Sequence, residues 1–274
     1  MQITPLSAMI GASITDIDLS KPLDEHQLAA INQAFLDYQV IIFRGQQLTP
    51  AEQRGFACQL GEPDIYPLLK GLDGFPEITP VLKKEDETVN FGGVWHTDTS
   101  YQPCPPKATM LYALELPPVG GDTLFSSQYA AHDALSEGLR QMLTQMRAIA
   151  IAGKGAVAAT RQKRIDEFGA DTDGESLRAC HPVVRTHPET GRKALYINKA
   201  HTLCFEGWTE AESEALLEML YAHQIREEFQ CRLRWGPGDL AIWDNRCVLH
   251  YPVNDYHGHR RLLHRITLKG DIPV

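Results

Sequence analysis

Cysteine is scarce in this sequence, and no two cysteines have the spacing of a metal or redox motif. The six cysteines lie at positions 58, 104, 180, 204, 231 and 247, without a single Cys-x-x-Cys pair. This spacing disfavours a zinc knuckle and a thioredoxin-type redox site. We expect the thiols to be reduced, with most of them acting as small core residues.

Long apolar runs and an excess of positive charge are also missing. No stretch approaches the roughly 18 to 20 apolar residues that span a bilayer, and the first residues lack the basic region and apolar run of a signal peptide. We therefore expect a cytoplasmic protein without a membrane partner. The 26 Lys and Arg residues are outnumbered by 35 Asp and Glu, for a net charge of −9. A field of that sign repels phosphates, so nucleic acid is not an expected partner.

No repeat, low-complexity tract or Ser/Gly/Pro-rich linker divides the 274 residues. A chain of this length fits one large β domain as well as two small ones. With 43% hydrophobic and 22% charged residues, the composition is that of an ordinary globular protein. We expect one domain over residues 1–274.

Helices are predicted early in the chain and strands late. Capping residues and apolar stripes predict helices over 24–38 and 209–224, and a segment that starts with Pro and ends with Gly predicts another over 50–61. Strands are predicted in the opening residues, over 40–45, in a hairpin over 181–198, and in the tail runs CRLRWG, DLAIWDN, CVLHYP and RRLLHRITLKG. This order favours a closed or sandwiched antiparallel sheet with helices packed outside.

Residues 147–179 differ from the rest of the chain. They are polar, rich in Gly and Ala, and poorly periodic. Long irregular segments in compact domains are often functional, so we expect a loop insert that lies near a site and acts as its lid.

The densest chemical signal is the run Trp95-His96-Thr97-Asp98. In an extended strand, residues i and i+2 point to the same face, so His96 and Asp98 would reach one ion together. Two His and one carboxylate on one face are typical of non-haem Fe(II) oxygenases. A His-x-Asp tripeptide alone is weak evidence, because such tripeptides arise by chance and a third ligand is required.

The tail offers that ligand at His250, which ends the aromatic run Trp243 to His250. A lone histidine is more often a core or surface residue than a ligand. The spacing leaves competing candidates, namely His181, His187, His201 and His264. The feature that favours His250 is the basic cluster that follows it at Arg260, Arg261 and Arg265.

Arg261 and Arg265 lie four residues apart on a predicted strand, so they face the same side. Two guanidinium groups that look into a cavity are costly without anions. They are explained if the cavity binds carboxylates, which arginine holds with two parallel hydrogen bonds. The alternative is an ordinary pair of surface salt bridges.

The sequence resembles the taurine dioxygenase family of Fe(II)/2-oxoglutarate-dependent oxygenases, which also includes phenoxyalkanoate herbicide dioxygenases. The resemblance covers nearly the whole chain and rests on five blocks in family-like order: WHTDTSY (95–101), PPVGGDTLF (117–125), HPVVRTHPETGRKAL (181–195), WDNRCVLHY (243–251) and RRLLHRITLKGD (260–271). It implies a double-stranded β-helix, a jelly roll with flanking helices. It also implies that residues 1–274 form a single catalytic domain, which assembles as a dimer or tetramer.

Within this resemblance, the implied iron ligands are His96, Asp98 and His250. Thr123 and Arg261 would hold the far carboxylate of 2-oxoglutarate. Three protein ligands leave positions for this cosubstrate and for dioxygen. The implied reaction hydroxylates a C–H bond of a substrate while 2-oxoglutarate gives succinate and carbon dioxide. Because Asp98 is present where related halogenases have a small residue, hydroxylation is the expected outcome.

The substrate implied is a small anion, a carboxylate or sulfonate with an apolar body. Arg265 matches the arginine that binds the sulfonate in the taurine enzyme. The remaining candidates for the substrate pocket are Tyr66, Lys70, Asn90, Tyr101 and His201. Tyr66 and His201 replace a histidine and an aromatic residue of the taurine enzyme, which disfavours taurine itself, and YPLLKGLDGFPE (66–77) is closer to phenoxypropionate dioxygenases.

Three alternatives stay open at this point. The same chemistry on a phenoxyalkanoate ether would make the hydroxylated product fragment. A zinc hydrolase would use the same three ligands with water, but it would not need Thr123 and Arg261. A non-catalytic protein on the same fold is the third alternative, although it would have no reason to keep all three ligands.

Overall fold

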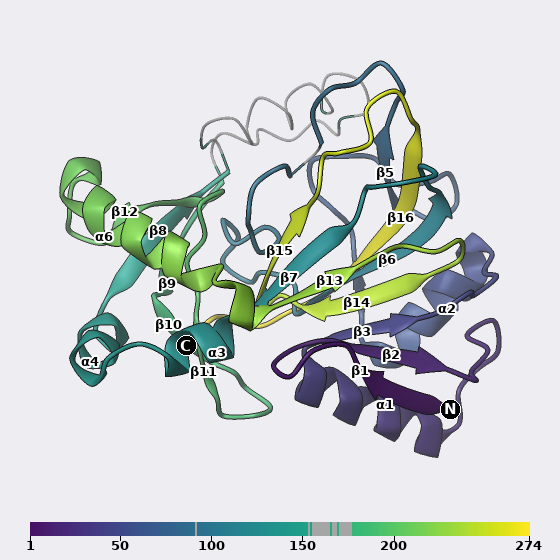
Figure 1. Cartoon of the computed structure of the whole chain (residues 1–274), viewed down its shortest axis with the longest axis horizontal. Coiled ribbons are helices and arrows are strands. Elements are labelled where there is room, and N and C mark those ends of the chain that lie inside the picture. Colours follow the sequence, from purple (N-terminus) through teal and green to yellow (C-terminus); the bar gives the residue numbers. More distant parts are fainter. Residues whose placement is uncertain (91, 153, 155–164, 166–168, 170–176) are drawn as a thin grey trace.

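The structure is a computed structural model that describes residues 1–90, 92–152, 154, 165, 169 and 177–274. Its centre is a large sheet that faces a small sheet (Figure 1). In the described part, eight strands form the large sheet in the order β1-β2-β3-β14-β6-β16-β4, with β5 also paired to β16. Their bounds are β1 Gln2–Pro5, β2 Ala12–Thr15, β3 Val40–Phe43, β4 Pro63–Asp64, β5 Thr79–Lys83, β6 Ala108–Glu115, β14 Leu240–Asp244 and β16 Arg261–Leu268.

The small sheet has the order β13-β7-β15 and lies against the large one. Its strands are β7 Thr123–Ser127, β13 Gln230–Leu233 and β15 Val248–Pro252. Apolar side chains of both sheets form one cluster, in which Phe125 and Val248 of the small sheet meet Trp243 and Leu263 of the large sheet. This sandwich confirms the predicted fold class, a mostly β jelly roll with flanking helices.

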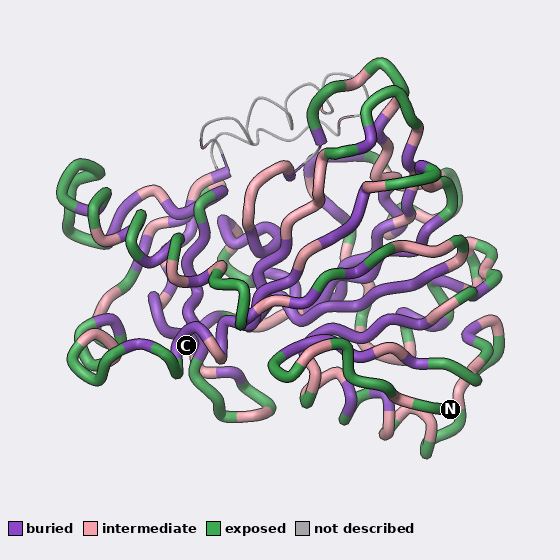
Figure 2. Tube along the Cα trace, viewed as in Figure 1, coloured by how far each residue is buried: buried purple, intermediate pink, exposed green. Residues whose placement is uncertain are grey.

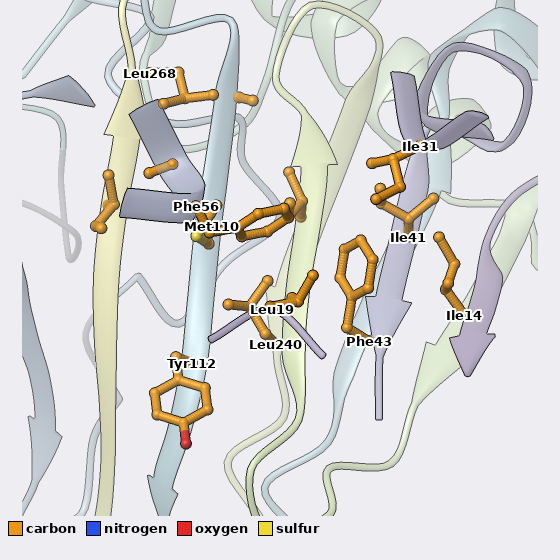
Figure 3. Close-up of a cluster of buried hydrophobic side chains, with 14 of the residues drawn as sticks. Ile14, Leu19, Ile31, Ile41, Phe43, Phe56, Met110, Tyr112, Leu240 and Leu268 are labelled. Atoms are coloured by element: carbon orange, nitrogen blue, oxygen red, sulfur yellow. The ribbon is translucent and has the colours of Figure 1, made fainter. Parts of the chain in front are cut away.

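Two helices cover the outer face of the large sheet: α1 (Glu25–Tyr38) and α2 (Pro50–Leu60). Each begins at a capping box, with Asp24 accepting from the Gln27 N–H and Thr49 from the Glu52 N–H; of the two caps, the sequence predicted Asp24. Figure 3 shows Ile31 of α1 among side chains of this sheet face. The helices predicted over 24–38 and 50–61 are confirmed, and they leave the inner sheet face free for a site.

A second layer of elements flanks the sandwich on the side opposite α1 and α2 (Figure 1). The strands here are β8 Arg147–Ile151, β9 Arg178–Pro182, β10 Val184–Thr186, β11 Lys193–Leu195 and β12 Thr202–Phe205. The helices are α3 Gln128–Asp133, α4 Glu137–Thr144, α6 Glu210–Gln224 and the 3-10 turn η1 Glu227–Phe229. The hairpin predicted over 181–198 is confirmed as β10 and β11, and the helix over 209–224 as α6 with its Thr209 capping box.

The segment 147–179 is only partly described. Its first five residues form β8, which pairs with both β9 and β12, so the prediction of an irregular stretch was wrong there. Alternation of small apolar residues in RAIAI is a strand signal that the following Gly- and Ala-rich residues obscured. The predicted lid falls on residues 153, 155–164, 166–168 and 170–176, which lie outside the described residues.

Burial follows this architecture (Figure 2). The central strands β3, β14 and most of β6 are buried along their length, whereas helix outer faces and turns are exposed. All six cysteines are free; Cys204, Cys231 and Cys247 are buried, so the expectation that most are core residues holds for half of them. Among the described helices, none combines the length and the apolar character that crossing a bilayer requires.

Candidate active site

The site begins where His96 meets His250 of β15. The two residues form an isolated antiparallel bridge, in which the His96 N–H donates to the His250 carbonyl at 3.0 Å and the His250 N–H to the His96 carbonyl at 2.8 Å. Their imidazole rings lie 4.1 Å apart between centroids. Backbone hydrogen bonds therefore bring together two residues that are far apart in the chain.

Asp98 completes this group. One ligand atom from each of His96, Asp98 and His250 lies within 4.8 Å of the others, and all three residues are buried. The prediction that residues 96–98 form an extended strand was wrong, because only His96 is bridged and Asp98 enters a turn in which Thr99 has a φ of 47°. The turn, rather than strand alternation, brings the Asp98 carboxylate back beside the imidazoles.

Both histidines direct a ring nitrogen toward this group. The His96 Nδ1–H donates to the Val94 carbonyl at 2.7 Å, so Nε2 is the ring nitrogen that faces the other ligands. Burial and the neighbouring His96 lower the pKa of His250 to about 3, so its ring is neutral near pH 7. Gly92 is needed for this arrangement, because a Cβ at its position would lie 2.9 Å from His96 Cε1 and its φ is 71°.

Asp98 is fixed by hydrogen bonds from β6. The Thr109 hydroxyl donates to Asp98 Oδ2 at 2.5 Å and accepts from the Asn245 amide at 2.8 Å. The Asn245 side chain in turn accepts from the Trp243 indole N–H at 3.0 Å. Oδ2 is thus occupied, and Oδ1 is the oxygen that faces His96 Nε2 at 3.7 Å. Outer hydrogen bonds of this kind orient metal ligands.

The pKa of Asp98 agrees with this assignment. Burial acts to raise it, but the interactions with His250 and Arg265, foremost among several, lower it to about 2. The group therefore offers one carboxylate oxygen, the neutral imidazole of His250 and the ring nitrogen of His96 that faces Asp98. This donor set fits Fe(II) and related divalent ions.

These ligands line a cavity between the two sheets, with about 630 Å³ of space that is partly open to solvent. Arg261 of β16 and Thr123 of β7 line it as well. Arg261 is almost fully buried, and its Nε and Nη2 have no hydrogen-bond partner among the described residues. The Thr123 hydroxyl accepts from the Trp235 indole N–H at 3.0 Å, so its own hydrogen is available to a ligand. An arginine fork and a hydroxyl donor fit a carboxylate.

Arg265 lies on the same strand, nearer to the metal ligands. Its Nη1 is 3.9 Å from Asp98 Oδ1, its guanidinium stacks 4.2 Å from the centre of the Tyr66 ring, and its buried Nη2 has no hydrogen-bond partner among the described residues. The prediction that Arg261 and Arg265 share a face of one strand is confirmed, since both line the cavity. The alternative of surface salt bridges fits only the adjacent Arg260, which pairs with Glu115.

The other predicted substrate residues lie at different depths. Tyr66, Tyr101 and His201 form a connected buried group: the two tyrosine hydroxyls are 3.4 Å apart, and the Tyr101 and His201 rings are 5.0 Å apart. The Asn90 side chain is held by the protein itself, since its amide donates to the Pro252 and Val253 carbonyls at the end of β15 and its oxygen accepts from Tyr256. Lys70 is exposed and is not among the described residues that line the cavity.

Two of the four competing histidines, His181 and His187, are accounted for by other contacts. The His181 ring lies 2.9 Å and 3.0 Å from the Ser100 and Gln102 carbonyls, and His187 contacts Asp244 at 3.0 Å. Sequence reasoning missed Thr109, Tyr256 and Lys83. Each is a common residue type without a motif of its own. Sheet pairing places Lys83 opposite Arg261 and Thr109 beside Asp98, whereas Tyr256 reaches the cavity from the segment between β15 and β16.

A family model describes nearly the whole chain. The model of the taurine catabolism dioxygenase TauD, TfdA family matches residues 2–267. The chain belongs to this family. It is thus an oxidoreductase of the dioxygenase class, as the sequence predicts, and the resemblance stated from its five blocks is confirmed.

Individual relatives agree with the family. The chain is 34% identical to an α-ketoglutarate-dependent sulfate ester dioxygenase of Pseudomonas putida over 100% of this chain and 91% of the relative. It is also 34% identical to the α-ketoglutarate-dependent 2,4-dichlorophenoxyacetate dioxygenase of Cupriavidus pinatubonensis over 98% of both chains. Its fold matches the crystal structure of a taurine dioxygenase from Burkholderia xenovorans with a TM-score of 0.83 and 35% identity, over 100% of this chain and 90% of the other.

The structure of AAD-2 in complex with Mn(II) and N-oxalylglycine is also similar, with a TM-score of 0.81, 26% identity, and coverage of 99% of this chain and 98% of the other. α-Ketoglutarate is 2-oxoglutarate, so the names of these relatives support the predicted cosubstrates 2-oxoglutarate and dioxygen.

Proposed function

We propose that this protein is an Fe(II)- and 2-oxoglutarate-dependent dioxygenase that hydroxylates a small organic anion. The observation that carries the proposal is one cavity with two open binding features. One wall presents the ligand atoms of His96, Asp98 and His250 within 4.8 Å of each other, and another presents the Arg261 fork, whose Nε and Nη2 have no hydrogen-bond partner in the described part of the chain. Bound Fe(II) would supply activation of dioxygen by the oxidative decarboxylation of 2-oxoglutarate to succinate.

The chain's own residues then have separate tasks. His96, Asp98 and His250 hold the metal, and Thr109 keeps Asp98 oriented. Arg261 and Thr123 bind the far carboxylate of 2-oxoglutarate, which fixes its keto acid end relative to the ligands. The apolar layer between the sheets keeps bulk water away from the reacting C–H bond.

The substrate proposed is an anion with an apolar body. Arg265 places Nη1 beside Asp98, and its buried Nη2 has no hydrogen-bond partner among the described residues. The Tyr66 ring lies against this guanidinium, Tyr101 contacts Tyr66, and His201 contacts Tyr101. Three relatives are named for sulfate esters, 2,4-dichlorophenoxyacetate and (S)-phenoxypropionate. These substrates also combine an anionic group with an apolar body. A phenoxyalkanoate substrate would be hydroxylated beside its ether oxygen, and the product would fragment.

Succinate release tests the proposal. Protein with Fe(II), 2-oxoglutarate and dioxygen is screened against alkyl sulfates, phenoxyalkanoates and sulfonates, with His250→Ala as the inactive control. We expect succinate in amounts matched to product for at least one anion, and an absolute requirement for dioxygen. Arg265→Met should raise KM for that anion far more than KM for 2-oxoglutarate.

The zinc hydrolase alternative gives a different result. Turnover that persists without dioxygen and without 2-oxoglutarate would favour the hydrolase and overturn the proposal. Cytoplasmic location, a single catalytic domain over 1–274, assembly as a dimer or tetramer, and the absence of nucleic-acid and membrane partners stay predictions.

A further inference from the structure

Lys83 is a third basic residue of the cavity, and sequence analysis gave it no role. It ends β5, where its Cα is paired directly with that of Arg261 on β16. Directly opposed residues of an antiparallel pair send their side chains to the same face, and like charges there are destabilising. Both side chains line the cavity. Two cations therefore face each other across the ladder.

The Lys83 ammonium has no polar partner among the described residues. The residue is 4% exposed, and its buried Nζ makes no hydrogen bond or ion pair there. Its ammonium group lies over the Tyr256 ring, whose centre is 4.4 Å from Nζ. An ammonium carries three donors, and burying it without an acceptor is costly. A bound anion would supply the missing acceptors.

Strand register indicates which anion this is. Arg265 pairs with Thr79 and Arg261 with Lys83, so Lys83 stands four residues along β5 from the level of Arg265. At about 3.3 Å per residue this is roughly 13 Å. Lys83 is thus at the Arg261 end of the cavity, and the metal-side cation Arg265 is at the other end. Tyr256 connects the two basic residues, since its ring centre lies 5.9 Å from Arg261 Cζ.

We propose that Lys83 binds the far carboxylate of 2-oxoglutarate together with Arg261, an inference that rests on the proposed function. The carboxylate then lies between two cations that repel each other in the free protein. Binding of a dicarboxylate relieves this repulsion, whereas a 2-oxo acid without the second carboxylate does not. Lys83 therefore contributes to selection of the cosubstrate.

A structural role is the competing explanation. An inward-pointing lysine on an edge strand protects the sheet against pairing with other chains. In the described residues β5 pairs with one strand, β16, and is therefore an edge strand. In that case Lys83 would influence stability and solubility, but not the choice between keto acids.

The experiment measures keto acid binding to Mn(II)-loaded protein by calorimetry, without turnover. Two ligands of equal length are compared: 2-oxoglutarate, and 2-oxopentanoate, in which a methyl group replaces the far carboxylate. The variants are Lys83→Met, Lys83→Arg and Arg261→Met. Lys84→Met, one residue further along the chain, serves as the matched control. Melting temperatures are recorded without keto acid.

We expect Lys83→Met to weaken 2-oxoglutarate binding about 10- to 100-fold, the range of a charge-assisted contact. Binding of 2-oxopentanoate should change less than twofold, and Lys84→Met should bind both ligands normally. Lys83→Arg should retain most of the affinity for 2-oxoglutarate. The keto-acid-free melting temperature of Lys83→Met should equal or exceed that of the wild type, because a buried repulsion is removed.

Other outcomes separate the two proposals. If Arg261→Met loses 2-oxoglutarate but Lys83→Met binds it normally, or if Lys83→Met weakens both keto acids equally, the role of Lys83 is overturned and the proposed function stands. If Arg261→Met binds 2-oxoglutarate as the wild type does, the cosubstrate site of the proposed function is itself wrong.

Discussion

Two buried groups each combine a His, an Asp and a third residue that could bind a metal. Within each group the three ligand atoms lie within 4.8 Å of one another, but the surroundings of the two groups differ. One is His96, Asp98 and His250; the other is His187, Asp244 and Cys247. In the second group, Asp244 accepts from Arg246 through both carboxylate oxygens and from His187 through one of them. Burial also raises the pKa of the Cys247 thiol well above its usual value, so it stays protonated.

The histidine of the second group also has partners at both of its ring nitrogens. His187 Nδ1 accepts the backbone N–H groups of Glu189 and Thr190, while its Nε2–H donates to Asp244. Within the described residues, both ring nitrogens of His187 and both carboxylate oxygens of Asp244 are thus occupied, and the Cys247 thiol keeps its proton. At the first group the hydrogen-bond partners contact the outer atoms, His96 Nδ1 and Asp98 Oδ2, while the inner atoms His96 Nε2 and Asp98 Oδ1 face each other at 3.7 Å. Residue type alone does not make a metal site; the direction of the remaining lone pairs does.

Removing one histidine from each group sharpens this comparison most. His96→Ala should abolish tight Fe(II) binding and lower turnover at least about a thousandfold, since metal catalysis supplies several kcal/mol. His187→Ala should keep one metal per folded chain. Metal content after dialysis, together with circular dichroism, checks both variants. Loss of metal from His187→Ala with retention in His96→Ala would reverse the assignment of the two groups.

Asp244→Asn should lower the free energy of unfolding and leave metal binding unchanged. It removes the buried countercharge of the Arg246 guanidinium and leaves the half-exposed Glu189 as its carboxylate partner, and breaking a buried ion pair costs about 3–5 kcal/mol. Urea unfolding at pH 7 measures this loss. Glu115→Gln, which breaks the exposed pair with Arg260, is the matched control and should cost at most about 1 kcal/mol.

The same variant predicts a pH dependence. Burial acts to raise the pKa of Asp244, but Arg246 and His187 outweigh it and hold the pKa well below its usual range. Because the folded pKa lies below the unfolded value of about 3.9, the stabilisation is complete above that value and is lost as pH falls through the folded pKa. The stability gap between wild type and Asp244→Asn should therefore be constant from pH 5 to 7 and narrow below about pH 4. A gap that stays constant in acid would contradict the pairing.

The smallest effect is expected from the hydrogen bond that orients Asp98. Thr109→Val removes the hydroxyl without changing shape, and loss of an outer partner costs about 10- to 100-fold in metal affinity. Thr267→Val is the control, because Thr267 is also buried and its Cα pairs with Thr109 in the next strand. Thr109→Ser should restore Mn(II) affinity. Equal weakening by both valine variants would show a general effect on the sheet.

Sequence signals predicted those parts of the fold whose determinants are local. The capping boxes of α1 and α6 lie within four residues, and the β3 run VIIF is continuous. The β6 run is buried at six successive positions, five of them apolar, and carries no alternation that would tell its two faces apart. Its place between β14 and β16 depends on pairing with distant segments.

The candidate site shows the same limit. The residues His96, Asp98 and His250 were identified because they sit in family blocks, and the Arg261–Arg265 spacing predicted a shared face. Asn245 and Thr109, by contrast, are 136 residues apart and meet only after folding. The Asp98 turn was missed for a related reason, since its positive-φ residue is Thr99 rather than a glycine that would have marked it.

The reciprocal backbone pairing of His96 with His250 also bears on how the enzyme acquires its ion. In small zinc domains the ion itself assembles the ligands, and chelators unfold the chain. Here the sheet has already joined the two imidazoles before any ion arrives. Protein from which a chelator has removed the metal should therefore keep its tertiary structure. It should bind Fe(II) again without any refolding step.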